Sequence, residues 1–403
     1  MKVFFRLLFF LVIIFQSCNK DSFVIKSKEY EPIVLSDNQK QIVSGGNAFA
    51  MGLFSKFCEE ESGSFMISPL SVQYLLGLLA TGAAGETRSE ILKTVGFDGL
   101  DINTLNEFHK HLYAELMAAD NSVEILSANL IIYNQELIAG LKTDYIEDVQ
   151  NYYEAYMGGF VFSKTDMVKK INDYVSQRTK GMITELLKGV SPDSGLLALN
   201  TIYFNGRWNS RLEFSKNKTV LGLFTKDDGS QIEAKYMNCE SEVYYCESAG
   251  YQAVRLPYGN GAFAMDIYLP KSGNNLSVVT SDRQLKTPKV ATTVDITLPL
   301  FEIETRLEDM SKSLSGLGIV SAFGGGADFS NMLDCDACFN RVLHQTKITV
   351  TQTGTISAAA TLALMDGTVE DGEVAVFEAT HPFLFIISET STKTILFIGA
   401  FVG

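Results

Sequence analysis

The sequence predicts an α+β fold in one continuous domain. Segments with a helical spacing of apolar residues are concentrated early in the chain, and strand-like segments late. The regular βαβ alternation that a parallel α/β fold requires is absent. No internal repeat, charge block or Pro/Ser-rich linker interrupts residues 46–403. We therefore expect one domain, although 403 residues at roughly 150 per domain would allow two or three.

Helices are predicted where apolar residues recur every three or four positions. Phe49, Leu53 and Phe57 show this spacing. Ser68 followed by Pro69 is a strong start signal, because a hydroxyl caps a helix whose first residue is proline. The apolar continuation to residue 79 indicates that this helix is buried. Helical spacing also covers residues 86–95, 103–118, 142–156 and 166–187.

Strands are predicted where β-branched and aromatic residues lie between turn signals. Seven segments qualify: residues 122–133, 196–208, 231–245, 252–258, 263–269, 292–303 and 383–387.

The composition argues against nucleic acid as a partner. The chain has 33 Lys+Arg against 47 Asp+Glu, a net charge of −14. Such a surface repels phosphate backbones, and no dense basic stretch offsets the repulsion.

The first residues resemble an export signal. Lys2 and Arg6 precede nine apolar residues, 7–15, a run too short to span a bilayer, which needs ~20 residues. The run ends at Phe15-Gln16-Ser17-Cys18, which is similar to a bacterial lipobox with departures at Phe15 and Gln16. We expect residues 1–17 to be a signal peptide, Cys18 to be lipidated, and residues 18–45 to tether a domain that starts at Gly46. An ordinary secretory leader is the alternative.

The motifs of common enzymes are missing. No G-x-S-x-G, H-E-x-x-H or P-loop pattern occurs, and Gly324-Gly325-Gly326 lacks the frame of a dinucleotide site. His109 and His111 are two apart on a predicted helix, so they make a poor metal pair and are expected on a solvated face. A Ser/His/Asp triad that uses His344 or His381 is not excluded by spacing, but nothing positions a nucleophile.

The cysteines do not predict a disulfide framework, because five would remain after lipidation of Cys18. We expect packed or loosely paired thiols and no metal or cofactor. A zinc site is the alternative, because Cys335-x-x-Cys338 could combine with two distant cysteines. The five are Cys58, Cys239, Cys246, Cys335 and Cys338.

Residues 350–365 contain no charge and no proline, and an acidic run follows them. As a strand, one face would carry only small residues: Thr355, Ser357, Ala359, Thr361 and Ala363. Such a segment could slide between two existing strands, because proline would break the ladder and bulk would clash with the core. An ordinary Ala-rich strand or helix turn is the alternative.

Several spaced motifs together resemble the serpin family. Met66-Ile67-Ser68-Pro69-Leu70-Ser71 is similar to the family's shutter motif, and residues 199–208, which end in Arg207-Trp208, to its central-strand and breach motif. Residues 298–304, 317–318, 327–330, 381–385 and 395–399 match further family motifs in order. The resemblance covers residues 46–403. It implies a single domain with a large central mixed β-sheet, two further sheets, about eight or nine helices and an exposed reactive loop at about 352–376, as a monomer.

The resemblance also implies a function, namely suicide inhibition of serine proteases by insertion of the cleaved loop into the central sheet. The implied hinge departs from the inhibitory pattern at two positions, since Gln352 replaces a preferred Glu and Ser357 a preferred Ala. A non-inhibitory serpin-fold surface lipoprotein that acts as a binding module is the alternative. The hinge residues are Gln352, Gly354, Thr355, Ser357, Ala358, Ala359, Ala360 and Thr361.

The same resemblance assigns shutter and breach residues. Ser68, Ser71, Asn200 and His344 match the shutter, where polar side chains link strands that must part. Trp208, the single tryptophan, matches the breach, where the loop enters. An N-cap serine, a satisfied core histidine and a core aromatic are the structural alternatives.

Family spacing places the scissile bond at Thr368-Val369, with Leu364 and Met365 as alternatives. No Lys or Arg lies between residues 347 and 393, which disfavours trypsin-like targets. Elastase-like or subtilisin-like serine proteases are expected partners, and some cysteine proteases are also considered. A protease that cuts at Asp366 or Asp371 is a minor alternative.

Overall fold

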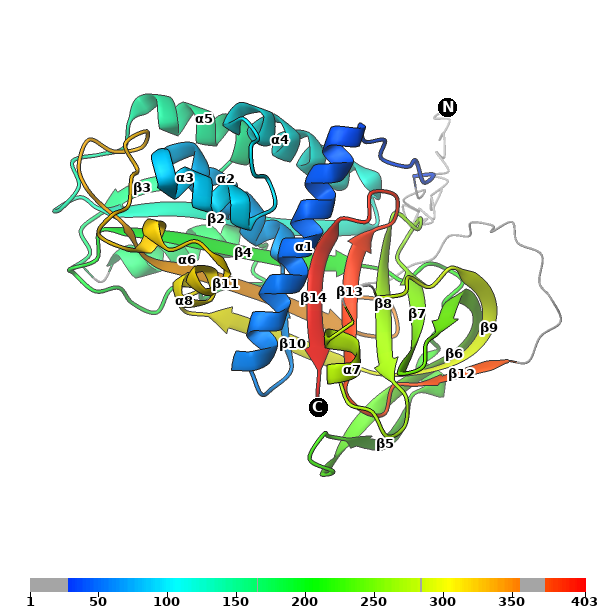
Figure 1. The fold of residues 1–403 in the computed structure, drawn as a ribbon. Helices are drawn as coiled ribbons and strands as arrows, with labels where there is room; N and C mark the ends of the chain where they lie inside the picture. Colours follow the sequence, from blue (N-terminus) through cyan, green and yellow to red (C-terminus); the bar gives the residue numbers. More distant parts are fainter. Residues whose placement is uncertain (1–27, 165, 283–284, 356–373) are drawn as a thin grey trace, which may run out of the picture.

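The computed structural model describes residues 28–164, 166–282, 285–355 and 374–403, and its described strands form two hydrogen-bonded sheets (Figure 1). The first sheet has five strands in the order β10-β11-β4-β2-β3. The second has nine strands and lies beside the first; β14 and β13 lie next to β1 at one edge, and β12 forms the opposite edge. The predicted α+β class is confirmed.

The five-stranded sheet combines distant parts of the chain. Its strands are β2 (Val123–Asn134), β3 (Tyr156–Phe160), β4 (Leu196–Gly206), β10 (Phe301–Leu307) and β11 (Phe339–Val350). Strand β11 was not predicted from the residue pattern, because its polar residues conceal the strand signal.

The nine-stranded sheet joins the two further sheets that were expected. Strand β6 is 17 residues long and pairs with β9 over most of its length and with β7 at its end, so one strand links both parts. The predicted strand at residues 292–303 is divided at Leu300, after Pro299, into β9 and β10. The nine strands are β1 (Phe65–Ile67), β5 (Val220–Thr225), β6 (Gln231–Glu247), β7 (Tyr251–Pro257), β8 (Phe263–Pro270), β9 (Val290–Pro299), β12 (Ala375–Glu378), β13 (Phe383–Glu389) and β14 (Ile395–Phe401).

Eight α-helices and two 3-10 turns occur in the described residues. The predicted helix at 166–187 ends at Arg178, because Lys180 and Gly181 adopt positive φ angles. The α-helices are α1 (Asp37–Glu60), α2 (Pro69–Gly82), α3 (Gly85–Thr94), α4 (Ile102–Ala119), α5 (Thr143–Tyr153), α6 (Asp166–Arg178), α7 (Ser277–Thr280) and α8 (Ser311–Leu317). The turns are η1 (Lys216–Lys218) and η2 (Ser321–Phe323).

The packed chain begins before Gly46, the predicted start of the domain. Ser36 caps α1 in a reciprocal capping box with Gln39, and Ile33 and Leu35 are buried. The sequence interpretation missed this start because the apolar positions before residue 46 are scattered among polar ones. The predicted signal peptide and Cys18 lie outside the described residues. Among the described helices, none is both long and apolar enough to cross a membrane.

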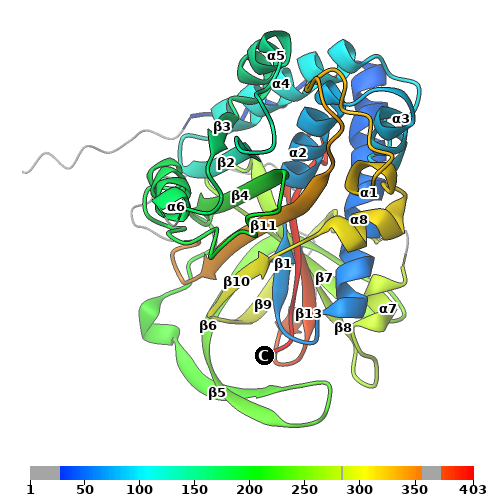
Figure 2. The same ribbon diagram turned by 90° about the vertical axis from the view of Figure 1, so that its left-hand side faces the viewer.

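Helices cover both faces of the five-stranded sheet. Helix α2 is buried along its whole length, as predicted, and Ser68 caps it by accepting a hydrogen bond from the Ser71 amide. Helix α6 packs on the opposite face, where Ile171 and Val175 meet alternate residues of β2 and β4 (Figure 2). Because helices cover both faces of the sheet, ten of the eleven residues of β4 are buried.

One histidine lies where the sequence interpretation did not place it. His109 is 1% exposed, not solvated, and its ring stacks on Tyr74 with centroids 4.5 Å apart. The spacing argument failed because α4 buries the face that carries His109, while His111 is exposed.

Candidate functional site

Strands β4 and β11 pair directly and in parallel at the centre of the five-stranded sheet. Their outer neighbours, β2 and β10, are antiparallel to them. A strand that ran opposite to both could therefore form antiparallel ladders on its two sides. We call the boundary between β4 and β11 the seam.

A buried polar network lies beside the middle of the seam. Asn200 of β4 is opposite His344 of β11, and the His344 Nδ1 and Asn200 Oδ1 atoms are 2.6 Å apart. The Ser68 backbone N–H donates to His344 Nε2 at 3.1 Å, so Nδ1 carries the proton and donates to Asn200. The Asn200 amide donates to Ser71 Oγ at 2.5 Å. The structure thus brings together all four residues assigned to the shutter.

Burial keeps this network uncharged. It lowers the pKa of His344 to about 3, so the imidazole is neutral near pH 7. Sequence reasoning missed one member, Asn129 of β2, whose Oδ1 accepts from the Asn200 amide at 2.6 Å. A polar residue in a largely apolar strand was the available signal.

Trp208 and Tyr258 form the upper end of the seam. Their rings stack with centroids 4.6 Å apart and planes 12° from parallel. The Trp208 indole N–H donates to the Thr351 carbonyl at 2.9 Å, directly after β11 ends. The assigned breach residue therefore contacts the chain that leaves the seam.

The first hinge residues are packed against the end of β4. Gly354 has φ +110°, and a Cβ there would overlap the Gly206 carbonyl oxygen. Thr355 is fully buried, and its N–H donates to the same carbonyl at 2.6 Å. Gln352 donates from its side chain to Thr219 Oγ1 at 2.7 Å.

The predicted loop at about 352–376 therefore joins described structure at both ends. Residues 352–355 lie against the upper end of the seam, and Ala375 and Val376 belong to β12. The other assigned loop residues lie outside the described part of the chain: Ser357, Ala358, Ala359, Ala360, Thr361, Leu364, Met365, Thr368 and Val369.

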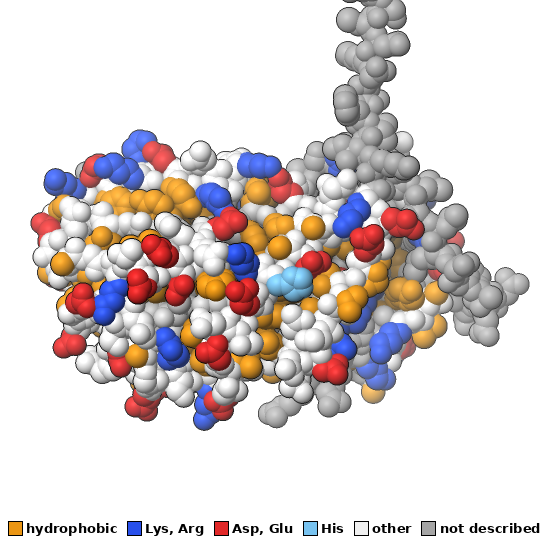
Figure 3. Space-filling view, turned by 90° about the horizontal axis from the view of Figure 1, so that it is seen from above, with side chains coloured by type: hydrophobic (Ala, Val, Ile, Leu, Met, Phe, Trp, Pro, Cys, Tyr) orange, Lys and Arg blue, Asp and Glu red, His pale blue; other side chains and the backbone are white. Residues whose placement is uncertain are grey.

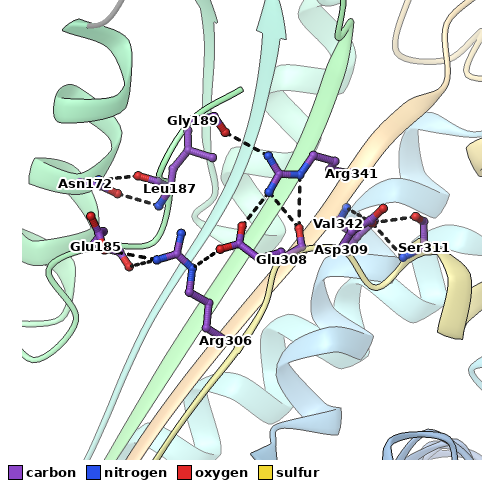
Figure 4. A network of polar contacts seen from close by, with 10 residues as sticks. All are labelled: Asn172, Glu185, Leu187, Gly189, Arg306, Glu308, Asp309, Ser311, Arg341 and Val342. Atoms are coloured by element: carbon purple, nitrogen blue, oxygen red, sulfur yellow. Dashed lines mark hydrogen bonds and ion pairs between the residues drawn. The ribbon is translucent and has the colours of Figure 1, made fainter. Parts of the chain in front are cut away.

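Two arginines fasten the segment between α6 and β4 across the seam (Figure 4). Arg306 of β10 lies between carboxylates, 2.9 Å from Glu308 and 3.5 Å from Glu185. Arg341 of β11 contacts Glu308 at 2.8 Å and donates to the Gly189 carbonyl at 3.0 Å. Because the fastened segment continues into β4, these contacts connect the two sides of the seam. We call them the arginine clasp.

The clasp was not predicted from the sequence, because its contacts with Glu185 and Gly189 join residues more than 100 positions apart. Asn172 of α6 supports it through hydrogen bonds to the backbone of Leu187 (Figure 4) and through one from the Leu186 N–H.

The five cysteines in the described part of the chain are free thiols. Burial raises the pKa of both Cys58 and Cys239 to about 12, which keeps these thiols protonated. Within the described ranges, no group of three or more His, Cys, Asp or Glu side chains could hold a metal ion.

Comparison with known proteins identifies this arrangement. The sequence pattern of the family described as Serpin (serine protease inhibitor) matches residues 44–403. The chain belongs to the serpin family. Serpins are generally protease inhibitors and not enzymes, and the two sheets of this serpin follow the family fold.

Relatives support the assignment over almost the whole chain. An uncharacterised serpin-like protein of Methanosarcina acetivorans is 30% identical over 417 aligned positions, which cover 98% of this serpin and 96% of the relative. The leukocyte elastase inhibitor of Xenopus laevis is 29% identical over 372 positions, which cover 88% and 97%.

Solved structures show the same fold. Tengpin, a thermophilic serpin in its native state, has a TM-score of 0.80 at 24% identity and covers 93% of this serpin and 97% of its own chain. Arabidopsis AtSerpin1, in its native stressed conformation, has a TM-score of 0.80 at 25% identity, with coverages of 92% and 99%.

Proposed function

We propose that this serpin is a suicide-substrate inhibitor of elastase-like or subtilisin-like serine proteases. The observation that carries the proposal is the direct pairing of β4 with β11, together with Gly354 and Thr355 packed at the end of that seam. The similar fold of AtSerpin1 in its native stressed conformation is consistent with a sheet that can still accept a strand.

The geometry suits insertion. A turn at residues 351–354 reverses the chain after β11, so the following residues would run antiparallel to both seam strands. Strands β4 and β11 are 11 and 12 residues long and offer pairing partners for about as many loop residues. The small residues that follow Thr355 suit the packed faces of this sheet.

The proposed mechanism traps the acyl-enzyme. The protease serine attacks the scissile carbonyl, the C–N bond breaks, and an ester joins the loop to the protease. Insertion then carries the protease to the far end of the sheet, a path of roughly 50 Å for the fifteen residues from Gly354 to Thr368 at ~3.3 Å each. The active site of the protease is distorted before water can attack the ester, so the protease is not released.

The target class rests on the loop sequence. No Lys or Arg lies between residues 347 and 393. The specificity pocket of a trypsin-like protease, which requires a basic side chain, would therefore find none in the loop. The name of the relative from Xenopus laevis, leukocyte elastase inhibitor, favours an elastase-like target.

A hinge substitution tests the proposal. We expect the native chain and elastase to form an SDS-resistant covalent complex. Thr355→Arg should be cleaved without forming it, because Thr355 is fully buried at the seam. Thr353→Arg is the matched control, since Thr353 is exposed two residues away and its replacement should leave the complex intact.

Cleavage of the native chain without a complex would overturn inhibition. A serpin-fold binding module would also show no rise in melting temperature after loop cleavage, whereas an inserted strand should raise it.

We also propose that Cys18 anchors the protein to a bacterial cell surface or outer membrane. Lipobox-like residues at the end of the leader support this proposal. Metabolic labelling with a fatty acid should mark the native chain and not Cys18→Ser, and unlabelled native chain would reject the anchor.

A further inference from the structure

Cys335 and Cys338 lie in a short segment that connects two buried parts of the chain. Leu333 before the segment is buried, and Phe339 after it is fully buried and begins β11. Cys335 is exposed and Cys338 is half-buried, and both are free thiols. A reagent in solution can therefore reach this pair of thiols.

The segment is held at its first end by Lys142, the residue that precedes α5. The Lys142 backbone N–H donates to the Met332 carbonyl at 2.9 Å, and its ammonium lies 2.9 Å from the Asp334 carboxylate. Within the described ranges, the main chain of residues 334–337 makes no hydrogen bond to the rest of the protein. These residues can therefore change conformation without breaking such bonds.

The spacing of the two cysteines is compatible with an intramolecular disulfide. Such a bond needs Cα atoms about 4.4–6.8 Å apart, and the first and fourth residues of a β-turn lie less than about 7 Å apart. The chain already bends at Asp334 and Cys335. A turn over residues 335–338 would therefore bring the two sulfur atoms within bonding reach.

The other described cysteines do not form such a pair. Cys239 and Cys246 are both on β6, seven residues apart, which corresponds to roughly 23 Å at ~3.3 Å per residue. Cys58 is on α1. Burial raises the pKa of Cys239 to about 12, so few of its thiols ionise and react.

We propose that Cys335 and Cys338 form a reversible disulfide by exchange with a small-molecule disulfide. The exposed Cys335 thiolate attacks one sulfur of the reagent and releases one thiol. The Cys338 thiolate then attacks the Cys335 sulfur of this mixed disulfide and releases the second thiol. The two protein sulfurs are oxidised, the two reagent sulfurs are reduced, and both protons pass to the released thiols. The oxidising surroundings of a cell surface, where the proposed anchor would place the protein, favour the disulfide.

The segment lies at the end of the seam opposite Trp208. The Trp208 indole donates to Thr351 just after β11 ends, whereas Cys338 directly precedes β11, whose 12 residues span roughly 40 Å at ~3.3 Å each. Positive and negative side chains are interspersed on the side of the molecule that carries α4 and α5 (Figure 3). A charged reagent that approaches from this side therefore meets no field of a single sign.

A disulfide in this segment would restrain the start of β11. Phe339 pairs with Leu196 of β4 at this end of the seam, and the two strands must separate here before a third strand can enter completely. The disulfide would fix the turn between Leu333 and Phe339 and so limit the movement of β11. If the loop inserts, which rests on the proposed function, oxidation should slow the last stage of insertion.

Alkylation followed by mass spectrometry tests the disulfide in the intact chain without any protease. The probe is 2-hydroxyethyl disulfide, which is neutral, so the net charge of −14 on the protein does not repel it. The tryptic peptide 313–341 contains Cys335 and Cys338 and no other cysteine. In the native chain this peptide should lose two hydrogens and carry no alkyl group, and the disulfide should exceed the reagent adduct at least tenfold. Cys338→Ser should instead keep one reagent adduct on Cys335, because no second thiol displaces it.

Cys246→Ser is the matched control, because Cys246 is also a half-buried free thiol but lies on β6. This substitution should leave the yield of the disulfide unchanged. Reagent adducts on both Cys335 and Cys338, or two thiols that stay reduced, would overturn the proposal if the chain keeps its native melting temperature.

A second measurement separates the disulfide from its effect on insertion. In the oxidised chain, the change in Trp208 emission after loop cleavage should reach completion at least twofold more slowly than in the reduced chain. The double variant Cys335→Ser/Cys338→Ser should show no difference after the same treatment. An unchanged rate in a chain that contains the disulfide would reject the coupling alone, and failure of inhibition would not affect the mass measurement.

Discussion

His344 of β11 and Asn200 of β4 face each other across the seam and are joined by a 2.6 Å hydrogen bond. The bond connects two strands that must separate if a third is to enter between them. Asn200 also bonds to Ser71 and Asn129, so one amide side chain links α2, β2 and both seam strands.

Asn200→Ala should destabilise the protein by about 3 kcal/mol, because it leaves several buried polar partners unsatisfied. Urea-induced unfolding followed by Trp208 fluorescence measures the loss. Asn217→Ala, at an exposed position of η1, should change the free energy of unfolding by less than about 0.5 kcal/mol. Equal effects of the two substitutions would contradict a structural role for the network.

The free energy of unfolding should fall as the pH is lowered from 7 to 5. Burial lowers the pKa of His109 and His344 to about 3, whereas an unfolded histidine titrates near 6.5. The unfolded chain therefore binds more protons, and stability present above pH 6.5 is lost towards pH 3. Each histidine should cost about 2 kcal/mol at pH 5. His109→Phe should remove about half of this dependence, and an unchanged dependence would refute the assignment.

Glu308→Gln should accelerate insertion of the cleaved loop severalfold, because Glu308 contacts both arginines of the clasp. Its effect on stability should stay below about 1 kcal/mol, since Glu308 is 49% exposed. Stopped-flow Trp208 fluorescence after cleavage measures the rate. Asp173→Asn breaks an exposed ion pair on α6 and serves as the control, with no acceleration expected. A clasp that does not hinder insertion would give equal rates for both variants.

Gly354→Ala should expel the hinge from the end of the seam. The residue would combine a positive φ with a Cβ that overlaps a backbone oxygen, at a cost of about 1–3 kcal/mol. Release of residues 351–355 would expose Trp208, so its emission should shift to longer wavelength. Gly326→Ala places its Cβ in open space and should leave the emission unchanged. An unshifted Gly354→Ala spectrum would show that the packing tolerates the methyl group.

Association with a cationic protease should slow as ionic strength rises, because Asp366, Glu370, Asp371 and Glu373 lie in or beside the proposed cleavage region. Rates measured at about 0.05 and 0.5 M salt test this, with an anionic protease as the comparison. An association rate that does not depend on salt would contradict the prediction that these carboxylates attract the protease.

Sequence reasoning predicted the parts of the fold that local patterns encode. Ser68-Pro69 predicted the start of α2 because capping depends on adjacent residues. His109 was predicted wrongly, because the two-residue spacing from His111 does not reveal which face of α4 is buried. Strand β11 was not predicted, because several of its residues are polar and make contacts with neighbouring strands.

By itself, the sequence determined the family motifs, the small residues after the hinge and the absence of basic residues from the loop, since each depends only on which residues are neighbours in the chain. Only the tertiary structure decided that His344 meets Asn200, that Arg306 and Arg341 clasp the segment after α6, and that Thr355 packs against Gly206. These contacts join residues more than 100 positions apart, and the pairing of β4 with β11 brings them together.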